Sequence, residues 1–368
     1  MKTVCKQDMC TGCMACADKC PKQAVSVKDD LTHFNAVIDE SRCVQCGLCE
    51  RVCQQVHPVQ KVQPLAWYEG WANDSSIREK ASSGGIATAV MFAFVREGGV
   101  VCSCTFTGGT FCYALAETEA EIRKFTGSKY VKSNPKGIYP QMLQKLKDGK
   151  KVLFVGLPCQ AAAAKRFAGE QYEAQLYTAD LICHGSPSPA LLETYLQQHG
   201  KSLQQMQEIG FRQSTAYRLT ENGKPLTNPR LTDRYAYSFL KSLNLTENCY
   251  ACPYADAERA ADLTLGDSWG TQLNDEKSKG VSLILCQTEK GKALLEAADL
   301  HLTPADAQRA VETNHQLKAP SQKPACREQF FALYGQGVPY DKIMAKCYPK
   351  VFLKQRVKAL LLKLKLLH

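Results

Sequence analysis

Short apolar runs and helical apolar patterns alternate along most of the chain. Short β-branched or apolar runs predict strands, and runs with apolar residues three and four positions apart predict helices. The two kinds alternate between residues 66 and 345, which favours α/β layers with a partly parallel sheet. Strands are expected at 100–106, 111–116, 151–155, 176–182 and 281–286, and helices at 85–97, 161–167, 189–199 and 290–297.

The first residues have a different pattern. Two short strands, 24–27 and 33–38, lie between cysteine-rich runs. Strand, cysteine loop and short helix repeated twice predict a two-fold pseudo-symmetric module. Residues 57–65 contain two prolines and no clear period, which indicates a linker.

Eight of the nineteen cysteines form two identical C-x2-C-x2-C-x3-C runs. This spacing is typical of two [4Fe–4S] clusters, because the fourth cysteine of each run binds the other cluster. Structural zinc and disulfides are the alternatives, but zinc sites usually show paired C-x2-C units. The expected ligands of one cluster are Cys10, Cys13, Cys16 and Cys53. Those of the other are Cys43, Cys46, Cys49 and Cys20.

Two details of the module depart from this pattern. Gln54 follows the second run where Pro21 follows the first. Cys5 lies outside the spacing, and we expect it to be a packed free thiol.

Composition places the chain among globular proteins of a reducing compartment. It has 368 residues, of which 45% are hydrophobic, and shows neither a signal peptide nor an apolar run long enough to span a membrane. Many cysteines without export signals favour metal ligation in the cytoplasm over disulfides. The net charge of +10 is concentrated in the tail and lacks the aromatic-interleaved pattern of nucleic-acid binding, so we expect no nucleic acid.

The tail, residues 346–368, predicts a basic amphipathic helix. Such a helix could make peripheral contact with an anionic membrane. The alternatives are a helix that packs on a partner protein and a solvated helix.

Four further cysteines suggest another site. Cys159 and Cys183 each follow a predicted strand on a glycine-bearing loop, at the edge where open α/β sheets bind ligands. Cys249 and Cys252 form a C-x2-C that could complete four thiolates, although independently packed cysteines remain the alternative. The cysteines without partner spacing, expected to be packed or surface thiols, are Cys102, Cys104, Cys112, Cys286, Cys326 and Cys347.

Several motifs resemble those of the family of coenzyme F-420 hydrogenase/dehydrogenase β subunits, which includes the 7-hydroxymethyl chlorophyll a reductase of plants. They are SSGGIATA (82–89), GSKYVKS (127–133), GLPCQ (156–160), CHGSPS (183–188), C-x2-C (249–252) and ADLTLGDSWG (261–270). The resemblance covers nearly all of the chain after the module. It implies a flavin, FAD or FMN, and a third [4Fe–4S] cluster on Cys159, Cys183, Cys249 and Cys252.

The resemblance also suggests four parts. They are a ferredoxin-type domain (1–62), a flavin-binding subdomain (63–150), a cluster and flavin domain (151–345) and the tail (346–368). The expected fold class is therefore a bacterial-type 2[4Fe–4S] ferredoxin module followed by a mixed α/β domain.

Small residues before a helix suggest where a flavin phosphate binds, because a helix N-terminus presents free N–H groups. Ser-Gly is also a common helix cap. Lys129 could offset flavin charge or be a surface lysine. Tyr130 could stack near the flavin ring or simply pack, and Trp269 could cover the flavin or the third cluster or be a core tryptophan at a turn. The expected cofactor contacts are Ser82, Ser83, Gly84, Gly85, Lys129, Tyr130, Asp267 and Trp269.

Catalytic roles are expected for His184 and Lys129. His184 adjoins Cys183 and could donate protons or tune the cluster. The leading hypothesis is an iron–sulfur flavoprotein oxidoreductase that passes electrons to a two-electron acceptor. One alternative is an electron-transfer subunit that serves a partner enzyme, and another is a flavin-free ferredoxin fused to a scaffold that serves polysaccharide synthesis.

The partners expected are a redox protein or small-molecule acceptor, within an oligomer or complex. Segment 211–219 (FRQSTAYRL) departs from the family pattern on the side expected to shape the substrate. Use of coenzyme F-420 itself is therefore left open by the sequence.

Overall fold

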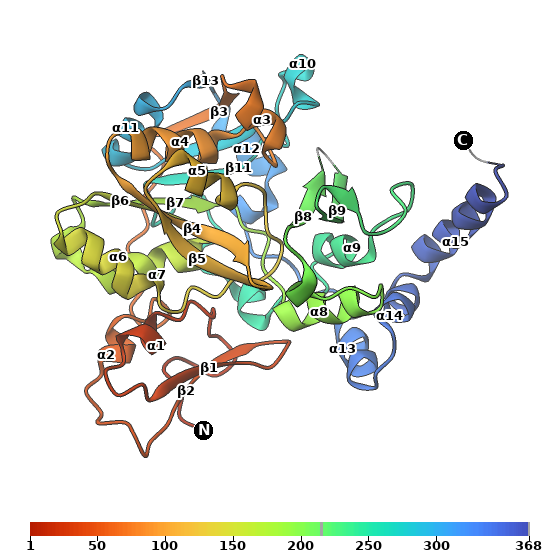
Figure 1. Cartoon of the computed structure of the whole chain (residues 1–368), viewed down its shortest axis with the longest axis horizontal. Coiled ribbons are helices and arrows are strands. Elements are labelled where there is room, and N and C mark those ends of the chain that lie inside the picture. Colours follow the sequence, from red (N-terminus) through yellow and green to blue (C-terminus); the bar gives the residue numbers. More distant parts are fainter. Residues whose placement is uncertain (214–215, 367–368) are drawn as a thin grey trace.

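A mixed eight-stranded sheet with helices on both faces forms the centre of the protein, and the N-terminal module lies beneath one face (Figure 1). The structure is a computed structural model that describes residues 1–213 and 216–366. The architecture confirms the expected mixed α/β fold with a separate ferredoxin-type module. Ser214 and Thr215 of the divergent segment 211–219, and the last two residues of the tail, lie outside the described residues.

The module repeats its backbone as well as its cysteines. Its elements are α1 (Ala15–Lys19), β1 (Val25–Asp29), β2 (Phe34–Ile38) and α2 (Leu48–Arg51). β1 and β2 pair antiparallel, with Val27 opposite Ala36. Each helix starts after a residue with a left-handed backbone, Met14 at φ 62° and Gly47 at φ 68°. The pseudo-symmetry predicted from the spacing is therefore present in the fold.

The large sheet contains four parallel strands flanked by antiparallel ones. Its strands are β3 (Ala66–Ala72), β4 (Val100–Thr107), β5 (Thr110–Ala116), β6 (Val152–Val155), β7 (Leu176–Leu181), β11 (Leu263–Asp267), β12 (Ser282–Cys286) and β13 (Leu300–Pro304). They run in the order β13-β3-β12-β11-β7-β6-β4-β5, and the pairs β4–β6, β6–β7 and β7–β11 are parallel. The partly parallel sheet expected from the sequence is confirmed.

Strand β6 shows why these strands look apolar throughout. Val152 and Phe154 face a core shared with the module, whereas Leu153 and Val155 face the opposite core. Both faces are covered, so no polar alternation survives. The helices α6 (Ile138–Lys147) and α7 (Pro158–Ala168) cover the module side, and α4 (Ile86–Arg96) and α11 (Glu289–Ala297) cover the other.

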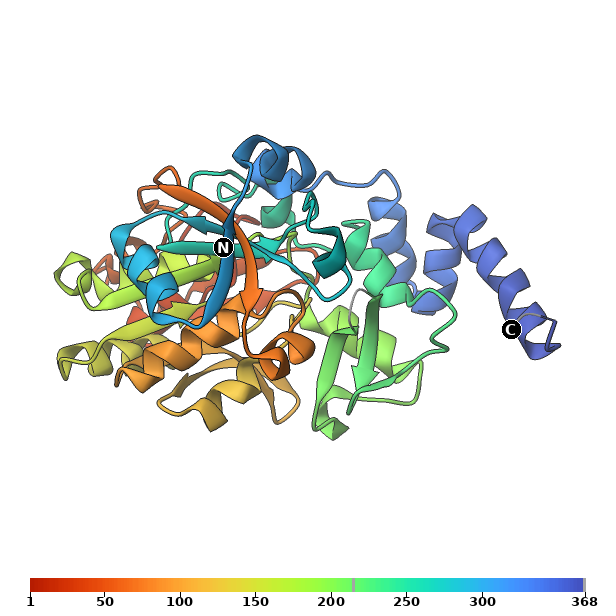
Figure 2. The same ribbon diagram turned by 90° about the horizontal axis from the view of Figure 1, so that it is seen from above.

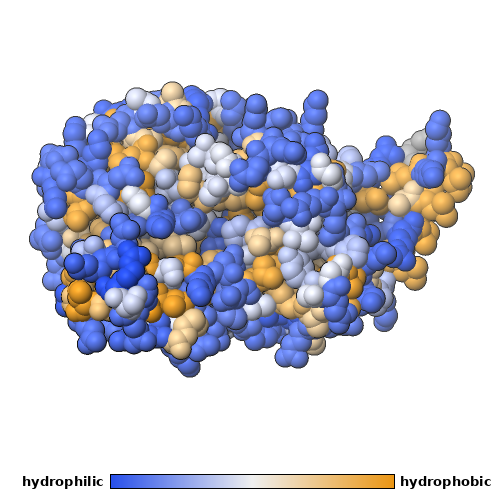
Figure 3. Space-filling view, turned by 60° about the horizontal axis from the view of Figure 1, so that its bottom comes forward, coloured by the Kyte–Doolittle hydropathy of each residue, from blue (hydrophilic) through white to orange (hydrophobic). Residues whose placement is uncertain are grey.

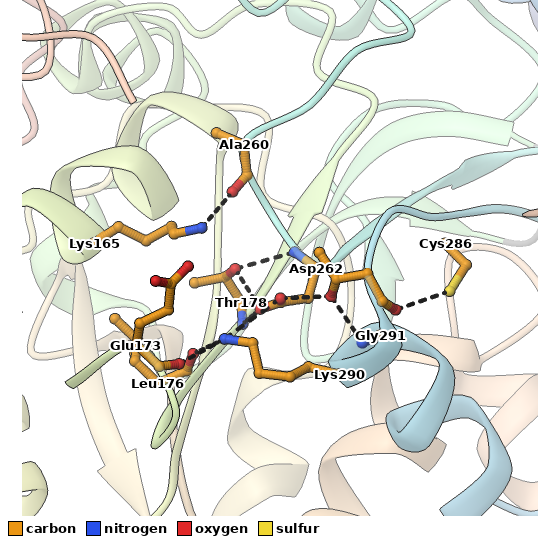
Figure 4. Close-up of polar contacts among 10 residues, drawn as sticks. Lys165, Glu173, Leu176, Thr178, Ala260, Asp262, Cys286, Lys290 and Gly291 are labelled. Atoms are coloured by element: carbon orange, nitrogen blue, oxygen red, sulfur yellow. Dashed lines mark hydrogen bonds and ion pairs between the residues drawn. The ribbon is translucent and has the colours of Figure 1, made fainter. Parts of the chain in front are cut away.

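Polar contacts fix the amino end of β11 to β7 (Figure 4). Asp262 accepts hydrogen bonds from the main-chain N–H and hydroxyl of Thr178, at 2.7 and 2.8 Å, and from the hydroxyl of Thr288 at 2.7 Å. Lys290 Nζ lies 3.5 Å from the same carboxylate and donates to the Leu176 carbonyl at 2.7 Å. These contacts hold the parallel strands in register, which aligns their carboxyl ends.

A smaller lobe lies beside the sheet (Figures 1 and 2). A three-stranded antiparallel sheet of β8 (Ile209–Gln213), β9 (Ala216–Glu221) and β10 (Lys224–Pro225) packs there. Its helices are α8 (Pro189–Gln197), α9 (Arg234–Leu240), α13 (Arg327–Gly335) and α14 (Tyr340–Cys347). The remaining helices of the chain are α3 (Ser75–Lys80), α5 (Glu119–Ile122), α10 (Asn274–Lys277), α12 (Ala307–Thr313) and α15 (Pro349–Lys363).

Helix α15 projects away from the smaller lobe, as Figure 2 shows, and Figure 3 shows apolar side chains on the surface of this projection. Phe352 is buried at its base, but the residues of an apolar stripe further along are exposed. The stripe residues are Leu353, Val357, Leu360 and Leu364. In residues 1–213 and 216–366, no helix combines the length and apolar character that a membrane crossing needs.

Candidate functional site

The cysteines of the module form two sets of unequal burial. The inner set, which is buried, consists of Cys10, Cys13, Cys16 and Cys53. The outer set, which is partly or fully exposed, consists of Cys20, Cys43, Cys46 and Cys49.

The neighbours of two thiols show how the sets are composed. Burial raises the pKa of Cys16 well above its ordinary value, and nearby thiols that include Cys53 raise it further. Burial also raises the pKa of Cys49, and Cys20 is among the groups that add to this effect. Cys53 therefore lies near a thiol of the first run and Cys20 near a thiol of the second, an arrangement compatible with the predicted exchange of ligands.

Main-chain N–H groups point at several of these sulfurs. Gly12 donates to Cys10 Sγ at 3.4 Å, Ala24 to Cys20 Sγ at 3.2 Å and Gln45 to Cys43 Sγ at 3.4 Å. Such bonds stabilise sulfur in its anionic form and tune bound clusters. The loops therefore suit thiolate ligands in both sets.

Cys5 lies against the inner set. Its thiol hydrogen-bonds to Cys10 and Cys53, and these bonds raise the pKa of Cys5 far above its ordinary value. The same bond from Cys5 lowers the pKa of Cys53 to about 6. Cys5 is packed, as expected, and it also contacts two predicted ligands.

The four dispersed cysteines meet around one small cavity, which we call the four-cysteine cavity. Cys159 lies in the first turn of α7, directly after β6, and Cys183 follows β7. Cys249 and Cys252 come from the turn 247–251 and its end. All four line the cavity. The structure therefore brings together the residues that the strand-end argument and the resemblance selected.

Electrostatics in this cavity disfavour four free thiolates. Burial, with smaller contributions from Cys249 and Cys252, raises the pKa of Cys183 to about 12. Burial likewise raises the pKa of Cys159 well above its ordinary value, and Lys132 is the first group to oppose this shift. Four converging thiols would lose their protons only when a bound cation compensates their charge.

Arg259 provides an independent test of whether an anionic group fits there. Its side chain is 1% exposed, and its charge lowers the pKa of Cys252 against the larger effect of burial. Within the described residues, none of its three guanidinium nitrogens has a hydrogen-bond partner, and the Asp180 carboxylate is 4.0 Å away. A buried cation with free donors close to Cys252 suits an anionic iron–sulfur cluster on the four thiols.

A single metal ion is not indicated by the geometry. Over residues 1–213 and 216–366, no group of three or more His, Cys, Asp or Glu side chains is arranged to hold one ion. Cluster ligands surround four irons and so lie around a larger centre.

A larger cavity of about 440 Å³ opens next to the four-cysteine cavity. Its volume is within the usual range for a small-molecule or cofactor site. Among the predicted contacts, those in its lining are Ser82, Ser83, Gly85, Lys129, Tyr130, Asp267, Trp269 and His184. Gly84 supports the wall from behind: a Cβ there would lie 2.3 Å from the Gly70 carbonyl oxygen.

The start of α4 suits a phosphate. Gly85, at φ 85°, precedes the helix, and no side chain caps its first N–H groups. Ser82 instead accepts a 2.8 Å hydrogen bond from the Ser128 N–H, which joins the two loops of this wall. Free N–H groups at a helix N-terminus favour an anionic ligand such as a flavin phosphate.

Lys129 directs its ammonium N–H groups at carbonyls of the loop that forms one wall of the larger cavity. Its ammonium donates to the carbonyls of Phe125, Thr126 and Gly127 at 3.0, 3.1 and 2.9 Å. Burial lowers its pKa below the usual range. Its geometry is that of a residue that organises the loop, and its predicted contact with flavin stays a prediction.

Tyr130 packs in an aromatic stack. Its ring lies 4.5 Å from Phe239 and 5.6 Å from Tyr217, both nearly parallel to it. Tyr130 also lines the larger cavity, and its predicted contact with a flavin stays a prediction.

Asp267 forms an ion pair that the sequence did not reveal. Arg212 Nη1 lies 2.7 Å from Asp267 Oδ2, and the Arg212 guanidinium lies 5.8 Å from the ring of Trp269. Trp269 is 51% exposed at the edge of the larger cavity. Arg212 belongs to the segment 211–219, whose departure from the family pattern does not by itself point to this arginine.

His184 lines both cavities. Its Nε2 lies 3.0 Å from the Phe239 carbonyl and from Ser242 Oγ, and its Nδ1 lies 3.0 Å from the Gln316 amide. Burial lowers its pKa, and the Phe239 carbonyl opposes this shift. These partners suit a neutral imidazole that donates through Nε2 and accepts at Nδ1.

Comparison with known proteins gives family matches for most of the chain. Residues 67–136 match the N-terminal model, and residues 149–307 the C-terminal model, of the coenzyme F420 hydrogenase/dehydrogenase β subunit. Residues 9–55 match a 4Fe-4S dicluster domain.

Individual relatives are more distant. In Methanosarcina mazei, a subunit of the F(420)H(2) dehydrogenase is 24% identical over 191 residues, which are 49% of this chain and 54% of that protein. In Methanosarcina acetivorans, a subunit of an ion-translocating oxidoreductase complex is 40% identical over 55 residues, 15% of this chain and 19% of that protein. The chain thus matches about half the length of the first relative and about a fifth of the second.

Among solved structures, one that is similar to this chain is a chain of the F420-reducing [NiFe] hydrogenase complex from Methanosarcina barkeri. It aligns with a TM-score of 0.49 at 17% identity, over 72% of this chain and 97% of that one.

Proposed function

We propose, from the premise that the chain belongs to the family of coenzyme F420 hydrogenase/dehydrogenase β subunits and carries a 4Fe-4S dicluster domain, that it is an iron–sulfur flavoprotein oxidoreductase. The inner and outer sets would each hold one [4Fe–4S] cluster. The four-cysteine cavity would hold a third, and the larger cavity a flavin. When bound, the clusters supply one-electron chemistry and the flavin supplies two-electron, hydride-type chemistry.

One observation carries this proposal. Cys183 and His184 line both the four-cysteine cavity and the larger cavity. A predicted cluster ligand therefore forms part of the wall of the predicted flavin site. This adjacency is what a protein needs if it connects one-electron and two-electron chemistry.

The burial of the cysteines supports a direction from the surface inward. The outer set contains the exposed Cys46, the inner set is buried, and the four-cysteine cavity lies beside the inner set because Thr11 is part of its lining. Electrons would enter at the outer set and leave at the larger cavity, where Trp269 stands at the edge.

The chain's own residues would position the flavin. The uncapped start of α4 would bind its phosphate, and the Lys129-bonded loop 125–127 would shape one wall. His184, held by Phe239, Ser242 and Gln316, would keep the shared wall rigid and dry.

Iron and flavin stoichiometry of anaerobically purified protein tests the proposal. Three clusters predict about twelve irons per chain, and one flavin should be released by acid. Cys159→Ala should reduce the iron to about eight per chain. The control is Cys102→Ala, which should leave the iron unchanged. Cys102 is a buried thiol that, among the described residues, is not part of the lining of the four-cysteine cavity. About eight irons in the unaltered protein, unaffected by Cys159→Ala, would contradict the third cluster. Absence of releasable flavin would contradict the flavoprotein assignment.

A second function is an electron-transfer subunit without a substrate of its own, for example in polysaccharide synthesis. The exposed stripe of α15 favours it, because a projecting apolar helix surface suits a partner. The names of both relatives describe subunits, which supports membership of a complex. Reduction of a small acceptor by the isolated chain would argue for the enzyme, and turnover only with a partner protein would argue for the subunit.

Peripheral membrane contact through the tail is a further proposal. Lys350, Lys354, Lys358 and Arg356 accompany the exposed stripe, so the surface combines apolar and cationic groups. Such surfaces bind anionic lipid.

A further inference from the structure

Lys132 is a buried cation that connects the domain of the eight-stranded sheet, which we call the core domain, with the N-terminal module. Its side chain is 4% exposed. Its main-chain N–H donates to the Pro187 carbonyl at 2.9 Å, and its Nζ donates to the Thr11 carbonyl at 3.1 Å. The side chain therefore reaches from the core domain into the loop between Cys10 and Cys13.

The module loop leaves space for this side chain. Gly12 has φ 68°, and a Cβ at Gly12 would lie 3.1 Å from Lys132 Cδ. The ring of Phe34 lies 5.0 Å from Lys132 Nζ. Gly12 thus permits the left-handed turn, and its lack of a side chain leaves space for the aliphatic part of Lys132.

The ammonium lies close to cysteines of both neighbouring sites. Lys132 itself lines the four-cysteine cavity, together with Thr11 and Cys159. Its Nζ is hydrogen-bonded to the carbonyl of Thr11, which directly follows Cys10 of the inner set. One charge therefore lies between the inner set and the four-cysteine cavity.

Burial of an ammonium is costly unless negative charge lies nearby. One carbonyl acceptor does not compensate a full positive charge. Two anionic clusters, one on each side, would compensate it, and the cation would in return stabilise the extra electron on either cluster.

We propose that Lys132 is a shared electrostatic positioning residue for the inner cluster and the cluster of the four-cysteine cavity. Its charge raises the reduction potentials of both and keeps them matched, so that one electron leaves one site and enters the other without a bond being made or broken. This inference rests on the proposed function, because it requires a cluster in each site.

Redox titration of the iron-loaded full chain, followed by electron paramagnetic resonance, tests the proposal. In Lys132→Gln, the potentials of the inner and four-cysteine sites should fall by an amount equivalent to about a tenfold change in the redox equilibrium, about 59 mV for one electron. The potential of the outer site should stay unchanged. Lys132→Arg, which keeps the charge, should restore the potentials.

A matched control is Lys165→Gln. Lys165 Nζ also donates to a main-chain carbonyl, that of Ala260 at 3.0 Å, but among the described residues it is outside the lining of the four-cysteine cavity. This variant should leave all potentials unchanged.

The outcomes separate the inference from the function on which it rests. Three clusters with unaltered potentials in Lys132→Gln would overturn the role of Lys132 and leave the proposed function standing. About eight irons in the unaltered protein would overturn both, since no second neighbouring cluster would exist. If Lys132→Gln loses iron, the Lys132→Arg variant decides the question. Retained iron and unaltered potentials in Lys132→Arg would support the role of the charge. Loss of iron in both variants would overturn it.

Discussion

The phenol of Tyr254 donates a 2.6 Å hydrogen bond to the side-chain carbonyl of Gln54, which lies 200 residues earlier. The amide of Gln54 in turn donates to Thr11 Oγ1 at 3.1 Å. Gln54 directly follows Cys53, and Tyr254 lies two positions after Cys252. The glutamine that departs from the Cys-Pro pattern therefore links the module to the four-cysteine cavity.

Gln54→Leu should destabilise the folded protein by about 1–3 kcal/mol, because it leaves the buried Tyr254 phenol without an acceptor. Tyr254→Phe should cost less, and adding it to Gln54→Leu should recover part of the loss. Thermal unfolding of anaerobic protein measures these differences as a double-mutant cycle. Additive effects of the two substitutions would show that the bond contributes nothing.

A matched control for this cycle is the exposed pair of Gln63 and Glu258, whose hydrogen bond is 2.7 Å long. Gln63→Ala should change the free energy of unfolding by less than about 0.5 kcal/mol, since water replaces the lost partner.

Cys5→Ala should leave the iron content unchanged, because Cys5 donates a hydrogen bond to predicted ligands rather than coordinating iron. Loss of that bond should lower the reduction potential of the inner site. Cys10→Ala provides the contrast, since it should lose iron. A fall of iron in Cys5→Ala comparable with that in Cys10→Ala would identify Cys5 as a ligand.

Asp180 predicts a specific pH dependence. Burial raises its pKa from 3.8 to about 6, while Arg259 and the hydroxyl of Thr264, at 2.6 Å, oppose the rise. The folded state therefore binds the proton more tightly than the unfolded state, so this group's contribution to stability falls as pH rises through that window. Asp180→Asn removes this dependence. The free energy of unfolding of the unaltered protein, relative to that of the variant, should therefore be larger at low pH than at pH 7.

The same substitution deprives Arg259 of its nearby carboxylate. Because burial outweighs Arg259 in setting the pKa of Asp180, this loss should cost little at pH 7, and the variant should match or exceed the stability of the unaltered protein there. Denaturation of the anaerobic protein across the window measures both effects. A difference in stability between the two proteins that does not change with pH would contradict the raised pKa of Asp180.

Gly84→Ala should destabilise the protein by about 1–3 kcal/mol and weaken flavin retention. The added Cβ would lie 2.3 Å from the Gly70 oxygen and 3.0 Å from the Ser282 nitrogen, so the loop of Ser83 and Gly85 has to move. Gly335→Ala is the control, because nothing lies within 4 Å of its Cβ position. Released flavin per chain should fall in the first variant only.

The tail should bring the protein to vesicles that contain phosphatidylserine. Leu360 and Leu364 are each 57% exposed, so Leu360→Glu with Leu364→Glu should abolish co-flotation without unfolding the chain. Raised salt should weaken binding of the unaltered protein. Equal flotation of the variant would assign the stripe to a protein partner instead.

Local pattern was enough to predict the strands that carry the site. Cys159 and Cys183 could be placed at one edge because parallel strands end together, and both line the four-cysteine cavity. β3 and β13 were not expected: β3 contains Glu69 and Gly70, and β13 is a partly exposed edge strand. Neither has the apolar run that distinguishes β6 or β12.

The other side chains of the site could not be predicted because they depend on contacts between distant parts of the chain. Lys132 gains its surroundings only when the module seats against the core domain, and Arg212 meets Asp267 only through the smaller lobe. In the sequence alone, nothing distinguishes either residue from other basic residues. The hydrogen bonds of Lys129 to three main-chain carbonyls likewise depend on the folded loop, and its expected role toward a flavin stays a prediction.

The N-terminal module also forms part of an enclosure. Thr11 and Gln55 belong to the lining of the four-cysteine cavity, although the four cysteines themselves come from the core domain. Undocking of the module would expose those sulfurs to water and oxygen. We therefore expect the docked module to limit the access of water and oxygen to these sulfurs, in addition to any part it has in electron transfer.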